Sequence, residues 1–174
     1  MTYLEEFLAK KKLGVSLAGP FARAKNMHGR WVFGSYITHL NRTPSPIGDS
    51  LSDDDVRFLI VQDGFSDWNM PRDIEGVDVD PNTVCLNSFI KDMDGRSIFE
   101  GDILFFEPAE YKGVVCFGTY TPTGYQQEDT AQGFYISWTT EGHIGMAKYL
   151  RNDLIYWASQ CKVVGTIFDK EEKK

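Results

Sequence analysis

The sequence has no long hydrophobic run, only three cysteines and fewer positive than negative charges, and each shortage excludes a class of protein. No stretch reaches the ~20 consecutive apolar residues that a transmembrane helix needs. The cysteines, Cys85, Cys116 and Cys161, lie far apart and fit neither a disulfide framework nor a zinc site. Acidic Glu5 and Glu6 stand where a signal peptide carries basic residues. We therefore expect a soluble protein of the reducing cytoplasm that does not enter a membrane.

Positive charge is scarce overall. The chain has 18 lysines and arginines against 25 aspartates and glutamates, which gives a formal net charge of −7. A protein that binds duplex nucleic acid non-specifically must neutralise phosphates, so we do not expect nucleic acid as a partner. Six cations nevertheless fall within the first thirty residues: Lys10, Lys11, Lys12, Arg23, Lys25 and Arg30. The favoured interpretation is a solvated basic segment, and a local basic face is the alternative.

What the sequence does contain is typical of a β protein. Aromatic residues make up 14% of the chain, and large aromatic side chains pack well on a pleated sheet. Sixteen glycines and seven prolines are scattered along the chain, as many short strands joined by turns require. The patterns predict polar loops at 41–55 and 118–133, and strands at 30–38, 56–62, 98–99, 103–106, 113–117, 134–138 and 162–168.

Helical patterns occur near both ends of the chain. Apolar residues repeat at helical spacing over residues 2–12, which predicts a short amphipathic helix. A helix of this length is unstable alone in water, so it must dock on its own domain or on a neighbouring subunit. Residues 1–27 are interpreted as a helical N-terminal extension and residues 170–174 as a frayed tail. The segment 146–158 is compatible with either a helix or a strand.

A long motif lies between residues 79 and 103. Val79-Asp80-Pro81-Asn82-Thr83-Val84 is followed, across a short predicted strand, by Lys91-Asp92-Met93-Asp94-Gly95-Arg96-Ser97-Ile98-Phe99-Glu100-Gly101-Asp102-Ile103. This pattern resembles the signature of the YopX-like family of phage and prophage proteins. The strand around Gly29–Gly34 and the ending Val163–Phe168 are also similar to that family, so the resemblance covers roughly residues 28–169.

The resemblance implies a mainly β fold. It implies an SH3-like barrel in the C-terminal half, residues 86–169, with additional N-terminal β strands in residues 28–85. It also implies a phage or integrated-prophage genome, and hence the cytoplasm of a bacterial host cell. Self-association is implied as well, and a further protein partner from host or phage stays open. The resemblance implies no established activity.

The acidic and glycine residues of the motif are predicted to shape the backbone. Gly95 and Gly101 supply turns in which a Cβ would clash, and Asp94-Gly95 is a turn signal. Asp102 can accept backbone N–H groups in the turn before the next strand. Turn support is therefore favoured over catalysis for Glu100 and Asp102. The apolar residues expected to fill the barrel are Ile98, Ile103 and Phe105.

No set of residues in the sequence predicts a catalytic, cofactor-binding or metal-binding site. Gly48-Asp49-Ser50-Leu51 matches a lipase and esterase motif, but Thr140 stands three residues before His143 where that family has Asp. His28, His39 and His143 form no pair at metal-ligand spacing. The four tryptophans could stack nucleobases, but without a basic groove they are interpreted as core residues.

Three functions follow from these patterns. The favoured one is a non-enzymatic, self-associating accessory or interaction protein. The alternative is a nucleic-acid-binding module that uses the barrel surface and the basic N-terminal segment, with binding that weakens steeply as salt rises. A hydrolase that uses Ser50 is the least supported, because the motif stands in a proline-containing loop without its partner residues.

Overall fold

The structure is a computed structural model that describes residues 21–43, 47, 52–63, 73–122, 130–139 and 150–169. These residues are mainly β, in antiparallel sheets with one short α-helix, and the chain divides into two compact units, Met1–Leu86 and Asn87–Lys174. Several predicted features lie outside the described residues: the helix at 2–12, the Gly48–Leu51 motif, and the tail 170–174.

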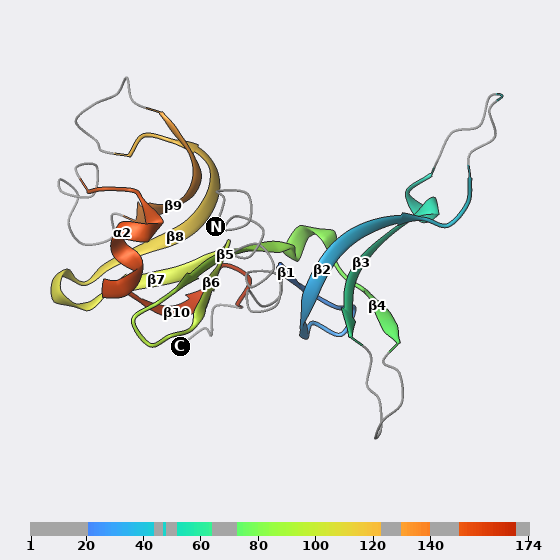
Figure 1. The fold of residues 1–174 in the computed structure, drawn as a ribbon, viewed down its shortest axis with the longest axis horizontal. Helices are drawn as coiled ribbons and strands as arrows, with labels where there is room; N and C mark the ends of the chain where they lie inside the picture. The colour runs from blue at the N-terminus through green and yellow to red at the C-terminus, as the bar shows by residue number, and fades with distance from the viewer. Residues whose placement is uncertain are drawn as a thin grey trace, which may run out of the picture. The chain divides into compact units, whose positions relative to one another are not determined.

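The first unit is built on an antiparallel sheet in which β4, β3, β2 and β1 lie side by side, with the start of β5 next to β1 (Figure 1). The short 3-10 helices η1 (Asp53–Asp55) and η2 (Pro81–Thr83) precede β3 and β5. The strands are β1 (Ala22–Lys25), β2 (Trp31–Leu40), β3 (Val56–Asp63), β4 (Ile74–Asp78) and β5 (Cys85–Lys91).

One face of this sheet packs into a small core. Gly34 on β2 lies so close to β3 that an added Cβ would be 2.2 Å from the carbonyl oxygen of Val61, so no larger residue fits there. The rings of Tyr36 and Phe58 stack across the same two strands with centroids 6.5 Å apart. The buried members of this core are Ala22, Ala24, Ile60 and Val79.

Strand β1 differs from the sequence-based expectation, which places residues 1–27 in a helical extension. Ala22–Lys25 pair with four residues of β2, and the first two of them also pair with Leu86 and Cys85 of β5. The two alanines face the core, and the two cations that alternate with them face the other side. The helical interpretation is therefore wrong for this part of the extension, because pairing with two neighbouring strands overrides the weak β propensity of alanine.

The second unit contains an antiparallel sheet in the order β10-β7-β8-β9, and the end of β5 pairs with β6 (Figure 1). The predicted strands at 98–99, 103–106, 113–117 and 134–138 are confirmed, the strand predicted at 162–168 ends at Thr166, and β8 and β9 extend into the expected loop at 118–133. The elements are β6 (Ser97–Phe99), β7 (Asp102–Phe106), η3 (Glu107–Ala109), β8 (Tyr111–Tyr120), β9 (Ala131–Thr139), α2 (Leu154–Trp157), η5 (Ala158–Gln160) and β10 (Lys162–Thr166). No helix among the described residues is long and apolar enough to cross a membrane.

Asp102 decides which face of β7 enters the core of the second unit. Its side chain is 1% exposed and accepts the Phe99 N–H at 2.8 Å, as predicted. Because side chains alternate along a strand, Leu104 shares the inward face with Asp102 and is fully buried. The expectation that Ile103 and Phe105 fill the core is wrong, since both lie half-buried on the opposite face. The buried core residues are Ile98, Leu104, Val115, Ile136, Leu154, Trp157, Ala158 and Cys161.

The turn between β5 and β6 is tied to β10 by Asp92. One carboxylate oxygen accepts the N–H groups of Asp94 and Arg96 at 2.9 and 2.8 Å, and the other accepts the Val163 N–H at 3.0 Å. Gly95 lies at φ +79°, which confirms the predicted turn at Asp94-Gly95. Residues 71 positions apart in the chain are thereby joined through a single buried carboxylate.

Residues 151–153 connect the ends of β8 and β9 to α2. The Arg151 carbonyl oxygen accepts the indole N–H groups of both Trp138 (3.0 Å) and Trp157 (2.7 Å). The Asn152 side chain donates to the Thr121 carbonyl oxygen at 2.9 Å. Within the ambiguous segment 146–158, residues 154–157 are helical, and the two buried side chains of α2 pack into the core.

Candidate functional site

The hairpin between β1 and β2 is closed by Asn26. Its Oδ1 accepts the N–H groups of His28 and Arg30, both at 3.0 Å, and its own N–H donates to the Arg30 carbonyl oxygen at 2.9 Å. Gly29 lies at φ +74°, a conformation that costs glycine nothing and other residues more. These bonds set the register in which the two strands face each other.

This register places cations beside aromatic rings on the face opposite the core. Arg23 pairs with Phe33, and Lys25 pairs with Trp31. The Arg23 guanidinium carbon lies 4.5 Å and the Lys25 Nζ 5.2 Å from the centroid of the Trp31 ring. Both are cation–π distances, in which the ring face attracts the positive charge. With Ile37 farther along β2, these residues form what we call the cation–aromatic face.

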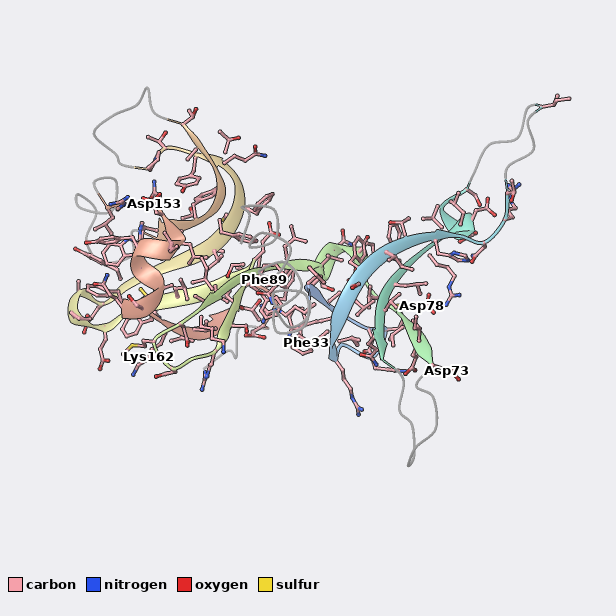
Figure 2. All side chains as sticks on the ribbon, viewed as in Figure 1. Phe33, Asp73, Asp78, Phe89, Asp153 and Lys162 are labelled. Atoms are coloured by element: carbon pink, nitrogen blue, oxygen red, sulfur yellow. The ribbon has the colours of Figure 1, made fainter. Side chains whose placement is uncertain are left out.

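The cation–aromatic face is partly open to solvent. Phe33 is 45% exposed and Ile37 is 41% exposed, whereas Arg23, Lys25 and Trp31 are half-buried. Figure 2 labels Phe33 on β2. Both side chains lie on the same face of β2, with the exposed Ser35 between them.

An ion pair links β3 and β4 on the same side of this sheet. Asp78 on β4, labelled in Figure 2, forms two hydrogen bonds with the guanidinium of Arg57 on β3. Those bonds lower the pKa of Asp78, so the carboxylate stays ionised and paired at neutral pH.

The second unit contains a polar cluster around Asp153. Its carboxylate accepts the Tyr120 hydroxyl at 2.9 Å and also bonds the Arg151 guanidinium. Burial opposes ionisation of Asp153, but the hydrogen bonds from Arg151 and Tyr120 outweigh it and lower the pKa of the carboxyl. The Tyr135 ring stacks on Tyr120 with centroids 5.0 Å apart. The Asp153 carboxylate is thus bonded to two side-chain donors.

Thiol chemistry is disfavoured in both units. Burial raises the pKa of Cys161 to about 11 and also raises the pKa of Cys116. Cys85 is 1% exposed, and its Sγ lies 3.3 Å from the Thr83 carbonyl oxygen. Neutral, buried thiols are poor nucleophiles and poor metal ligands. The three cysteines act as small packing residues, as the sequence indicates.

A surface hollow of about 310 Å³ lies beside the β7–β8 turn. Its lining includes Phe105, Glu110, Lys112 and Thr139, and the Lys112 Nζ lies 5.9 Å from the Phe105 ring centroid. Among the described lining residues, the Thr139 hydroxyl donates to the Lys112 carbonyl oxygen at 2.9 Å, whereas covalent catalysis requires a hydroxyl bonded to a general base. Glu100, for which turn support was weighed against catalysis, is not among the described lining residues.

The residues that the sequence analysis weighed as site candidates are dispersed. Asp102 serves the turn before β7, and His28 and His39 are exposed at separate places on the first unit. Among the residues that the structure describes, no group of three or more His, Cys, Asp and Glu side chains could hold a metal ion. The cation–aromatic face was missed by sequence reasoning, although the alternation of small and basic residues over Ala22–Lys25 was a signal for it.

No family model, no curated protein and no solved structure matches this chain.

Proposed function

We propose that this chain is a YopX-like protein of phage or prophage origin that acts as a non-enzymatic, self-associating interaction protein in the bacterial cytoplasm. The observation that supports it best is the use of the motif at residues 79–103. Asp92 and Asp102 are both buried and both accept backbone N–H groups, so these two acidic side chains of the motif hold turns. Because these side chains have structural roles, the function proposed for the chain depends on surfaces that contact other molecules, as in an interaction protein.

The proposal includes an SH3-like barrel in residues 86–169. Support comes from bonds between the β5–β6 hairpin and the four-stranded sheet. The first is the bond from the Val163 N–H to the Asp92 carboxylate. In addition, the Met93 N–H donates to the Cys161 carbonyl oxygen at 3.1 Å, and the Gly101 N–H donates to the Val115 carbonyl oxygen at 2.8 Å. Hydrogen bonds at both ends of the hairpin are what a small closed barrel requires.

Self-association is supported by the character of β10. Val164 on this strand is 53% exposed, and Ile167, just after its end, is 54% exposed. Exposed apolar side chains close together in the chain offer a surface that another protein molecule can cover. We expect a second copy to cover β10.

Light scattering coupled to size-exclusion chromatography tests this assignment. The wild type is expected to elute as a dimer or larger at ~100 μM, and Val164→Lys or Ile167→Lys is expected to shift it toward monomer. The matched control is Ile155→Lys, because Ile155 is also highly exposed but lies on α2. A monomeric wild type at that concentration would remove the self-association proposal. An esterase activity that Ser50→Ala abolishes would remove the non-enzymatic one.

A further inference from the structure

We propose that the surface hollow beside the β7–β8 turn binds a zwitterionic amino acid with an aromatic side chain. This inference goes beyond self-association and does not depend on it. Three side chains that line the hollow match three groups of such a ligand. Lys112 offers a cation to its carboxylate, Glu110 offers a carboxylate to its ammonium group, and Phe105 offers a ring to its side chain.

Strand register brings three of the lining residues side by side on one face of the sheet. Phe105 of β7 pairs with Lys112 of β8, and Lys112 pairs with Thr139 of β9. Residues paired in this way share a face, and the buried Leu104 next to Phe105 lies on the other one. The Thr139 hydroxyl donates to the Lys112 carbonyl oxygen at 2.9 Å, which ties the two strands together at this point. Paired strands therefore set the spacing of these lining residues.

Lys112 and Glu110 bring opposite charges to the same hollow. Both side chains are exposed, and among the residues that the structure describes neither one forms an ion pair. The neighbouring Lys162 Nζ and Glu107 Oε2 differ in this respect, because they lie 3.9 Å apart and compensate each other. A zwitterion satisfies both unpaired charges at once.

Glu110 also has an uncommon backbone conformation. It lies in the turn between β7 and β8 at φ 56°, in the left-handed region that residues other than glycine rarely adopt. Its N–H donates to the Glu107 carbonyl oxygen at 3.3 Å, which closes the turn. Strained backbone of this kind is found most often at ligand sites.

The Phe105 ring and the size of the hollow define the rest of the ligand. The Lys112 Nζ lies 5.9 Å from the ring centroid, near the ~6 Å limit of a cation–π contact, so this contact is weak. An aromatic ligand can pack against the ring edge-on or offset while its carboxylate reaches the ammonium group. The volume of about 310 Å³ is at the small end of the ~300–1,000 Å³ that ligand pockets span, which favours a single amino acid.

The experiment titrates the isotope-labelled full-length protein with L-phenylalanine and follows its amide signals in two-dimensional NMR spectra. Three analogues each lack one group of this probe: 3-phenylpropionate lacks the ammonium group, phenethylamine lacks the carboxylate, and glycine lacks the ring. The analogue series on the wild type tests the proposal without any variant.

Two variants then remove one charge each from the hollow, Lys112→Gln and Glu110→Gln. Their matched controls are Lys91→Gln and Glu75→Gln, because both residues are exposed and neither is among the described lining residues. Circular dichroism melting shows whether each variant is folded.

L-phenylalanine is expected to shift the amide signals of Phe105, Lys112 and Thr139 saturably, with a Kd of about 1 mM, because exposed ion pairs add little affinity. Glycine is expected to give no saturable shift. Lys112→Gln is expected to weaken binding of L-phenylalanine and 3-phenylpropionate at least about threefold and to leave phenethylamine unchanged. Glu110→Gln is expected to weaken L-phenylalanine and phenethylamine by a similar factor and to leave 3-phenylpropionate unchanged.

Absence of saturable shifts at about ten times that concentration overturns the proposal. Equal weakening by the control variants also overturns it. If 3-phenylpropionate binds at least as tightly as L-phenylalanine, the hollow is a site for anions, and if phenethylamine does, it is a site for cations. Either result excludes a zwitterion as the preferred ligand.

Discussion

Phe89 lies at φ 58°, in the left-handed region that a bulky side chain rarely adopts. Two buried polar side chains hold it there: Asn87 Oδ1 accepts the Phe89 N–H at 2.8 Å, and Ser88 Oγ accepts the Ile90 N–H at 3.2 Å while donating to the Ile98 carbonyl at 2.7 Å. The register between β5 and β6 shifts at this point. The bulge is thus maintained by its neighbours against the local preference of phenylalanine.

Comparing the variants Phe89→Gly and Phe89→Ala separates the effect of backbone strain from the effect of lost side-chain packing. Phe89→Gly is expected to be more stable than Phe89→Ala by about 1 kcal/mol, because only glycine adopts the left-handed conformation without cost. The same pair at Phe33, whose backbone is extended within β2, is expected to show the reverse order by about 0.5–1 kcal/mol. Urea denaturation of the four variants measures both differences. If the stability difference between the glycine and alanine variants had the same sign at both positions, the strain assigned to Phe89 would be contradicted.

Asp102 is a second residue whose effect is local and testable. Asp102→Ala leaves the Phe99 N–H without its acceptor in a buried site, so the free energy of unfolding is expected to fall by about 1–3 kcal/mol. Asp102→Asn keeps an oxygen at the same place and is expected to lose less. Asp94→Ala, at an exposed position, is the control. Urea denaturation in which the alanine variant matches the wild type would contradict the turn-supporting role.

At the scale of elements, the β5–β6 hairpin and β10 depend on Asp92. Because this carboxylate accepts three backbone N–H groups, Asp92→Ala is expected to cost at least about 2 kcal/mol of stability. Hydrogen exchange at the Val163 amide is expected to accelerate in this variant. Asp73→Ala, exposed before β4, is expected to leave that amide unchanged. Unaltered protection of Val163 in the Asp92 variant would show that β10 is held by other contacts.

The link between β8 and α2 is expected to weaken in acid. Asp153 has a lowered pKa in the folded chain, so its stabilising contribution is present above its ordinary value of 3.8 and is lost as the pH falls through the lowered pKa. The stability difference between the wild type and Asp153→Asn is therefore expected to be largest near neutral pH and to shrink in strong acid. Denaturation measured across that range checks this, and a difference that grows toward low pH would reverse the assigned sign.

At the scale of the whole molecule, each compact unit contains a buried thiol that reports on its integrity. Cys85 is 1% exposed and Cys161 is fully buried. In the native protein at pH 8, neither is expected to react with Ellman's reagent on the timescale of an exposed thiol, whereas all three cysteines react in concentrated urea. Cys85→Ser and Cys161→Ser assign any signal to its unit. Rapid labelling of Cys161 under native conditions would contradict its burial and its pKa of about 11.

The chain alone determined most strand positions and the turn chemistry. The segments at 103–106, 113–117 and 134–138 are strands because local side-chain pattern dictates local backbone, and Asp94-Gly95 needs no distant partner to form a turn. Asp102 was likewise predictable as a turn acceptor, since the N–H it binds is three residues away.

Only the tertiary structure decided which strand faces are buried and which strands pair. These features depend on pairs of residues far apart in the chain. The inward Asp102 placed Leu104 rather than Ile103 and Phe105 in the core, a choice that an entirely apolar strand leaves open. Pairing with β2 and β5 made a strand of Ala22–Lys25, and so brought its cations to the aromatic rings of β2. Strand register is a long-range property, and it created the cation–aromatic face.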